Sequence, residues 1–150
     1  MHIPYYKQKF AYTCGPAVMR MVLEALGISR TEEQLAQMLH TSMRIGTPNR
    51  MFSRVFERFK FSYTVGRHGR THNLIDLLRK KHLIIVCYFY PPEKVGHFAV
   101  VKKIANRKIY LLDPAAGPEV TYRTYEFARL WNKTGMFDRE KGWLIAVKPE

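Results

Sequence analysis

A chain of 150 residues with a net charge of +13 and only two cysteines excludes several classes of protein. Its length suits one domain with a sizeable core, and a hydrophobic content of 47% argues against disorder. Two cysteines are too few for a disulfide scaffold and lack the spacing of zinc ligands. There is no signal-peptide core and no apolar run of about 18 residues, as a membrane helix needs. We therefore expect a single cytoplasmic domain over residues 1–150, and export by a route without a classical signal stays open.

Amphipathic helices are predicted in the first half of the chain, each with a stripe of apolar residues at helical spacing. They are expected over residues 14–26, from 31 onward, after 48, and over 72–81. Pro16 suits the first turn of the first helix, and Gly27 suits its end. The TEEQ sequence that begins at Thr31 is typical of a capping box at the start of the second.

The second half of the chain is rich in β-forming residues. Strands are expected over 82–90, 97–105, 108–114 and 142–149, with a short helix over 125–131 and an edge strand over 61–66. Asn106-Arg107 predicts a tight hairpin turn between two of these strands. Helices first and antiparallel strands second indicate an α+β fold, with the helices packed on one side of a sheet.

Cys14 stands where an irregular segment turns into the first predicted helix. Cysteine reacts as the thiolate, and the unpaired N–H groups and the dipole of a helix N-terminus favour that charged form. Cys87 instead lies inside the apolar run IIVCYF, so we expect it to be a small buried side chain. We interpret Cys14 as a candidate nucleophile.

His97 is the best placed of the six histidines to act as a base, because it opens an apolar strand directly after Gly96. Asp113 closes the next strand, just before Pro114, and is a candidate for orienting the imidazole. Each residue alone has an ordinary structural explanation. Together, the order Cys, His, Asp is the nucleophile, base and orienting group that cysteine chemistry needs.

The predicted hairpin brings His97 and Asp113 only loosely together. In a straight hairpin about Asn106-Arg107, Asp113 lies near the level of Val100, about three residues from His97. At about 3.4 Å per residue, the separation is about 10 Å unless a β-bulge shifts the register.

Three motifs, Q-x5-CGPA, GHFAVV and LLDPAAG, resemble those of the C39 peptidases and their C39-like relatives, which are papain-like cysteine proteases. The resemblance covers roughly residues 4 to 117 in motif order, and the closing strand fits the same fold. It implies a papain-like fold with N-terminal helices packed on a C-terminal antiparallel sheet. It also implies a cysteine endopeptidase that cleaves a peptide or protein through a thioester acyl-enzyme.

The resemblance assigns roles to four residues. Cys14 would be the nucleophile, His97 the general base and acid, and Asp113 the group that orients the imidazole. Gln8, six positions before the cysteine, would donate its side-chain amide to the oxyanion, together with the backbone N–H of Cys14. No cofactor or metal ion is expected in this chemistry.

The chain departs from the leader peptidases of the family in two ways. Those proteins often carry an acidic residue just before the cysteine, where Thr13 stands here, and they are usually fused to an ABC transporter. The CGPA form is more similar to the stand-alone C39-like proteins. We expect the cysteine chemistry to carry over more fully than the double-glycine leader substrate.

Residues 44–81 hold ten Lys and Arg residues against two acidic residues, an excess of eight positive charges. A solvated, solubilising surface is the simplest interpretation, and selection of acidic peptide substrates is another. We favour a peptide over nucleic acid as the partner, because the segment has no nucleic-acid recognition motif. Two alternatives to a protease remain open: another acyl transfer at the same site, such as deamidation, transglutamination or ligation, and a basic binding module with an idle site.

Overall fold

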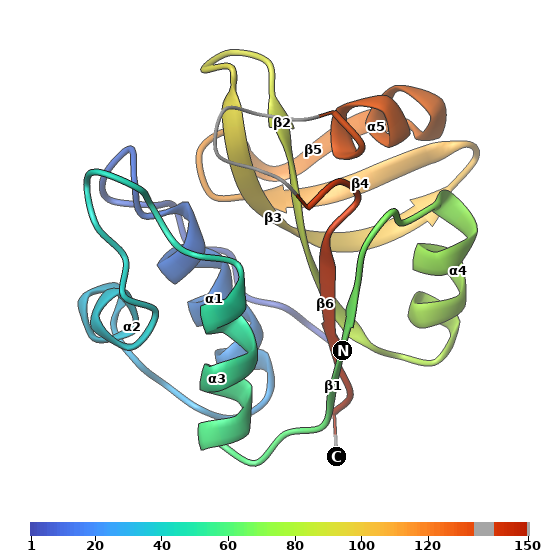
Figure 1. Cartoon of the computed structure of the whole chain (residues 1–150). Helices are drawn as coiled ribbons and strands as arrows, with labels where there is room; N and C mark the ends of the chain where they lie inside the picture. The colour runs from blue at the N-terminus through green and yellow to red at the C-terminus, as the bar shows by residue number, and fades with distance from the viewer. Residues whose placement is uncertain (134–139, 150) are drawn as a thin grey trace.

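A six-stranded antiparallel sheet forms the centre of residues 1–133 and 140–149, which the computed structural model describes (Figure 1). The strands are β1 Tyr63–Gly66, β2 Leu83–Tyr90, β3 Val95–Ala105, β4 Lys108–Asp113, β5 Gly117–Arg123 and β6 Leu144–Val147. The helices are α1 Cys14–Ala25, α2 Glu32–Met38, α3 Arg50–Arg58, α4 Thr71–Arg79 and α5 Thr124–Trp131. Across the sheet the strands follow the order β1-β6-β2-β3-β4-β5.

Most of the predicted elements are confirmed, including the edge strand near residues 61–66, which is β1. The exception is β5, for which the sequence gives little signal. Its residues, GPEVTYR, include a proline, and its side chains are only half-buried or exposed. An outer strand of this kind lacks the apolar alternation that identifies strands in a sequence.

The hairpin between β3 and β4 turns at Asn106-Arg107, as predicted. Both residues have positive φ angles, 53° for Asn106 and 63° for Arg107. Two consecutive residues in this region are typical of a type I′ turn, whose twist matches that of the strands on either side. The position of this turn determines how β3 and β4 pair.

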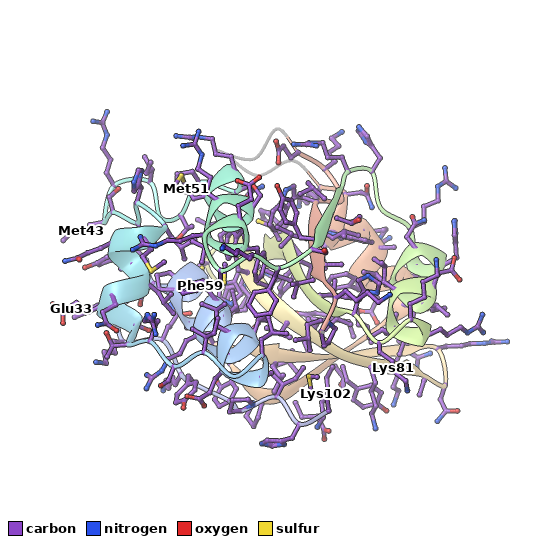
Figure 2. All side chains as sticks on the ribbon, turned by 90° about the horizontal axis from the view of Figure 1, so that it is seen from below. Glu33, Met43, Met51, Phe59, Lys81 and Lys102 are labelled. Carbon is purple, nitrogen blue, oxygen red and sulfur yellow. The ribbon has the colours of Figure 1, made fainter. Side chains whose placement is uncertain are left out.

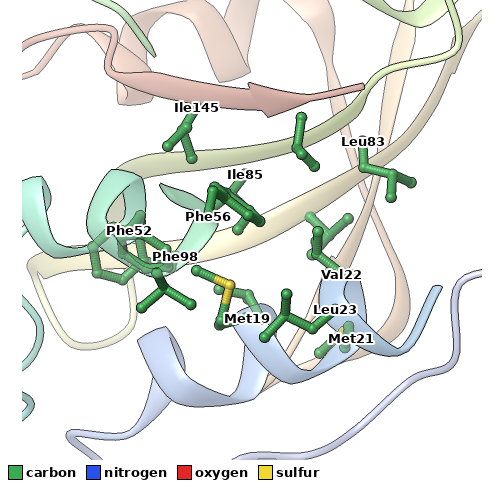
Figure 3. Close-up of a cluster of buried hydrophobic side chains, with 14 of the residues drawn as sticks. Met19, Met21, Val22, Leu23, Phe52, Phe56, Leu83, Ile85, Phe98 and Ile145 are labelled. Carbon is green, nitrogen blue, oxygen red and sulfur yellow. The ribbon is translucent and has the colours of Figure 1, made fainter. Parts of the chain in front are cut away.

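The first three helices lie on one side of the sheet, where α1 and α3 pack on the strands and α2 packs on α1. α1 turns Met19, Val22 and Leu23 toward the sheet, where side chains such as Ile85 and Phe98 meet them (Figure 3). The buried stripe of α1 explains why this helix lies where it does, since burying one such side chain stabilises the fold by about 1.5–3 kcal/mol.

The end of α1 and the start of α2 are formed by the residues that the sequence predicts there. Gly27, just after α1, has a φ of 90°, which ends that helix as expected. The side chains of Thr31 and Gln34 form the predicted capping box at the start of α2.

The opposite face of the sheet is also covered, which corrects the expectation of helices on one side only. α4 and α5 pack there through a second buried cluster that includes Leu74, Phe127 and Trp131. In Figure 2, Glu33 and Met43 mark the layer of α2 and α3, and Lys81, which follows α4, lies on the other side. The sequence predicts the helices but not the face of the sheet on which each one packs. Among the described residues, no helix has both the length and the apolar character needed to cross a membrane.

Candidate active site

Cys14 is the first residue of α1 and is half-buried. The chain enters the helix through a tight turn, in which the backbone N–H of Thr13 donates to the carbonyl of Phe10 at 3.1 Å. The Thr13 hydroxyl strengthens this turn by donating to the same carbonyl and accepting from the N–H of Phe10, both at 3.0 Å. Since the first N–H groups of a helix have no intrahelical acceptor, the N–H of Cys14 faces a position where negative charge is stabilised.

Gly15 allows a loop to approach the helix start closely. A Cβ atom at Gly15 would lie 2.2 Å from the hydroxyl oxygen and 2.7 Å from the Cβ of Thr47. Thr47 is buried, and its hydroxyl is 2.7 Å from that of Thr41. The glycine after the cysteine is therefore required by packing, because any side chain there would displace the loop between α2 and α3.

A β-bulge brings Asp113 to His97. The register between β3 and β4 shifts at Lys102, so that Val100 pairs with Leu112. One step beyond this pair, Asp113 lies on the same face of the sheet as His97, whereas a straight hairpin would place it on the other face. The separation of about 10 Å expected for a straight hairpin is therefore absent, and His97 Nε2 lies 2.8 Å from Asp113 Oδ1.

The carboxylate of Asp113 is fully buried and accepts hydrogen bonds on both oxygens. In addition to His97, the backbone N–H groups of Ala115 and Ala116 donate to Oδ1 at 2.9 and 3.0 Å. The Tyr88 hydroxyl donates to Oδ2 at 2.7 Å. The group that faces the imidazole is thereby fixed in position.

His97 is 2% exposed and lies between aromatic rings. Tyr90 stacks on the imidazole with 4.3 Å between ring centroids, and Tyr88 meets it edge-on at 5.9 Å. The Cys14 thiol is close enough to the imidazole to raise the pKa of His97 through hydrogen bonding and charge. Because Nε2 is held by Asp113, Nδ1 is the ring nitrogen left for the thiol.

The charged groups of the site shift one another's pKa values. Burial alone would lower the pKa of His97, but the hydrogen bonds to Asp113 and Cys14 and the charges of both groups raise it to about 10. Burial acts to raise the pKa of the Asp113 carboxyl, but the hydrogen bond and charge of His97, with donors from Tyr88 and Ala115, hold it below its ordinary value. An imidazolium between a carboxylate and a thiol is the arrangement that favours a thiolate.

Gln8 lies in the segment that leads to α1. Its Nε2 donates to the carbonyl oxygens of Phe10 at 2.8 Å and Ala11 at 3.3 Å. Its backbone N–H donates to the carbonyl of Pro114 at 2.9 Å, which ties this segment to the turn after Asp113. The side-chain amide is thus held within the turn before Cys14, and its longer bond is the one that a stronger acceptor would displace.

A cleft of about 590 Å³ opens beside Cys14. It is lined by residues from the N-terminal turn and the start of α1, the loop before α3 and its first residue, the middle of β2, the start of β3 and the segment before β6: Ala11, Tyr12, Cys14, Arg44, Ile45, Gly46, Thr47, Pro48, Asn49, Arg50, Cys87, Val95, Gly96, Phe98 and Glu140. Cys87 is 5% exposed and packs in the core beneath this cleft, as expected of a small apolar side chain.

The structure brings Cys14, His97 and Asp113 together and places Gln8 in the turn before α1. Sequence reasoning missed Tyr88, since which strands pair, and in which register, is not visible in the sequence. The alternation of Tyr88 and Tyr90 in β2 was the available signal, because it puts both rings on one face. Among residues 1–133 and 140–149, no three His, Cys, Asp or Glu side chains are grouped as metal ligands.

Comparison with known proteins places these residues in a family context. Residues 2–141 match the model of the peptidase C39 family. The chain is 32% identical over 124 residues to an uncharacterized protein of Methanothermobacter thermautotrophicus, covering 83% of this chain and 80% of that protein. It is 26% identical over 129 residues to LagD of Lactococcus lactis, a lactococcin-G-processing and transport ATP-binding protein, covering 85% of this chain and 18% of LagD.

Solved structures share the fold. The peptidase domain of Streptococcus ComA, a bifunctional ABC transporter involved in quorum sensing, has a TM-score of 0.79 at 19% identity and covers 99% of this chain and 100% of that one. A double glycine motif protease from an AMS/PCAT transporter, solved with its leader peptide, has a TM-score of 0.72 at 23% identity, covering 99% and 93%. These likenesses confirm the predicted papain-like α+β fold. Since the family match spans most of its length, the chain belongs to the peptidase C39 family.

Proposed function

We propose that this protein is a cysteine endopeptidase and that residues 1–150 act as one C39-like peptidase domain. The observation that carries the proposal is the chain of contacts from Asp113 through His97 to Cys14, beside a cleft large enough for a peptide. A thiol, an imidazole and a buried carboxylate in this order are the parts of an activated nucleophile.

The proposed reaction has two halves. Before the substrate reacts, the thiol proton of Cys14 is already on His97, and the sulfur of the resulting thiolate bonds to the carbonyl carbon of the peptide. His97 then returns the proton to the departing amine as the C–N bond breaks, which leaves a thioester on Cys14. In the second half His97 removes a proton from water, the hydroxide bonds to the thioester carbon, and the C–S bond breaks to release the acid. Asp113 keeps the imidazole in one orientation throughout.

Gln8 and the helix start are proposed to stabilise the oxyanion. The N–H of Cys14 lies in the first turn of α1, and the Gln8 amide is held in the turn before it. For the amide to donate to an oxyanion, it exchanges its 3.3 Å bond to Ala11 for a charge-assisted one. Donors of this kind act where charge develops in the transition state, so they accelerate the chemical step more than they tighten binding.

The substrate is proposed to be a peptide that carries acidic residues. Arg44 and Arg50 are exposed and line the cleft beside Cys14. Glu140, the one acidic residue among the lining residues of the described chain, accepts from Arg67 at 3.1 Å and from Asn49 at 3.3 Å. The mouth of the cleft therefore has an excess of positive charge that attracts carboxylates.

This charge continues away from the cleft along α3. Arg50, Arg54 and Arg58 are four residues apart, so they lie on one exposed side of the helix. Within the described part of the chain, none of them is in an ion pair. We name Arg50, Arg54 and Arg58 the arginine track. The similar AMS/PCAT protease was solved in complex with a leader peptide. For this chain, the proposed substrate is a peptide that is recognised by its acidic residues.

A peptide library that includes acidic sequences tests the proposal. Products are identified by mass spectrometry for the wild type, Cys14→Ala and the matched variant Cys87→Ala, which removes the other thiol. We expect two fragments per cleaved peptide for the wild type and Cys87→Ala, and none for Cys14→Ala. Cleavage by Cys14→Ala at the wild-type rate would overturn the proposal, and a mass gain near one dalton without fragments would assign the site to deamidation instead.

A further inference from the structure

The two oxygens of the Asp113 carboxylate are held very differently. Oδ1 accepts from three donors, namely His97 Nε2 and the N–H groups of Ala115 and Ala116. Oδ2 accepts from Tyr88, whose hydroxyl lies 2.7 Å away and is its one side-chain hydrogen-bond donor among residues 1–133 and 140–149. Without Tyr88, a fully buried carboxylate oxygen would lose that partner.

Tyr88 is fixed in place by the same strands that hold the imidazole. In the ladder between β2 and β3, Tyr88 is directly opposite His97, so both side chains lie on one face of the sheet. Its ring is 1% exposed and packs against Tyr90, Tyr122 and Phe127, with centroids 5.4 to 6.3 Å apart. A ring held on several sides keeps its hydroxyl at one point.

We propose that Tyr88 is a positioning residue that fixes the Asp113 carboxylate, and through it the imidazole of His97, in the orientation that aims Nδ1 at Cys14. The inference rests on the proposed function for its kinetic consequence. Two anchored oxygens determine the plane of the carboxylate, and His97 is aligned by its bond to one of them. The hydroxyl is also a donor that favours the ionised form of a buried acid.

A simpler explanation is that Tyr88 only packs. Buried tyrosines usually find a hydrogen-bond partner, and the Tyr88 hydroxyl finds one in Asp113. The two explanations differ in what the hydroxyl does. In both cases Tyr88→Phe makes Asp113 protonate at a higher pH, because burial then acts with one donor fewer. If Tyr88 only fills space, the variant keeps the ring and leaves kcat unchanged. If it positions the carboxylate, the same variant also lowers kcat.

The test measures Asp113 directly. Other groups that face Asp113 are the imidazole of His97 and the phenols of Tyr5, Tyr90 and Tyr122. All four side chains are retained in Tyr88→Phe, and Tyr122 then loses the influence of the Tyr88 hydroxyl on its own pKa. A shift in the ¹³C-carboxyl NMR titration of Asp113 therefore reports the lost hydroxyl. We expect the titration to move to higher pH and kcat for peptide cleavage to fall about 10- to 100-fold with little change in KM.

Two further variants show whether the effects come from the hydroxyl of Tyr88. 3-Fluorotyrosine at position 88 is a stronger donor of similar size, so we expect it to move the Asp113 titration to lower pH and to retain kcat near the wild-type value. Tyr63→Phe is the matched control, because Tyr63 donates to Glu57 at 2.6 Å in another part of the molecule. We expect this control to change neither measurement.

The outcomes separate this inference from the proposed function. An unshifted Asp113 titration in Tyr88→Phe would overturn the positioning role, even if kcat falls. A shifted titration with wild-type kcat would also overturn it. A shifted titration in a protein without Cys14-dependent cleavage would support the contact of Tyr88 with Asp113 and count against the peptidase.

Discussion

The two sides of the proposed site are built in opposite ways. His97 and Asp113 are 2% and 0% exposed, lie on strands of the sheet, and are surrounded by hydrogen bonds and aromatic rings. Cys14 is half-buried at a helix start, next to an open cleft whose rim includes Arg44 and Ile45, both exposed. The sheet side is arranged before a substrate arrives, and the helix side is open to receive one.

The two sides therefore have different roles in the proposed reaction. Low dielectric and complete hydrogen bonding strengthen the interaction between imidazole and carboxylate. The open side instead needs donors and charges that become engaged only when a peptide is present. Changes on the open side should therefore affect cleavage or substrate choice while leaving the imidazole pair intact.

Gln8 gives the largest expected effect on the open side. In Gln8→Ala the oxyanion loses a donor, so we expect kcat for peptide cleavage to fall about 10²- to 10³-fold. The rate of Cys14 alkylation by iodoacetamide should stay near the wild-type value, because that reaction forms no oxyanion. Gln37→Ala, an exposed position in α2, is the matched control. An unchanged kcat in Gln8→Ala would remove Gln8 from the proposed mechanism.

Gly15 tests how tightly the helix start and the loop fit together. The Cβ of Gly15→Ala would overlap Thr47, so we expect the free energy of unfolding in urea to fall by about 1–3 kcal/mol. Adding Thr47→Gly removes the overlapping atoms and should restore much of the loss. Gly96→Ala is the steric control, since a Cβ there would meet Cys87 Sγ at an ordinary 3.5 Å. Equal stability of Gly15→Ala and the wild type would contradict the close approach.

The arginine track gives the smallest expected effect. Replacing Arg50, Arg54 and Arg58 by Gln should raise KM for an acidic peptide about tenfold at low salt, comparable to the loss of a few exposed ion pairs. The effect should shrink at high salt and be absent for the same peptide with Gln in place of Glu.

Removing the same amount of charge elsewhere is the control for the track. Arg79, Lys80 and Lys81 lie at the end of α4, and Lys81 is on the far side of the molecule from Met43 (Figure 2). Their replacement by Gln should leave KM near the wild-type value. An equal rise in KM for both triple variants would mean that net charge, and not the track, selects the peptide.

The sequence predicts the open side of the site better than the closed side. Cys14 could be found because a cysteine at a helix boundary is a local feature, and helix boundaries have local signals such as Pro16. His97 and Asp113 could be identified as residue types at strand ends. Their contact could not, because it depends on the bulge at Lys102, and one residue of register decides which face Asp113 occupies.

The same reasoning explains the errors in the predicted fold. Strands with continuous apolar runs, such as β2, are visible in the sequence, whereas β5 at the sheet edge is not. The face that α4 and α5 cover follows from how the chain crosses the sheet, and amphipathicity alone does not show it. Tyr88 was missed for the related reason that its partner Asp113 is 25 residues away in the chain.

The most direct test of the central claim is the pH dependence of Cys14 alkylation by iodoacetamide, with peptide mapping to assign the label. The raised pKa of His97, about 10, predicts an imidazolium beside Cys14 throughout the neutral range. We expect rapid alkylation of Cys14 at neutral pH and a change in rate as the pH passes about 10 and the imidazolium loses its proton. His97→Ala should react slowly at neutral pH and speed up only as a simple thiol ionises. Identical profiles for the wild type and His97→Ala would contradict the account.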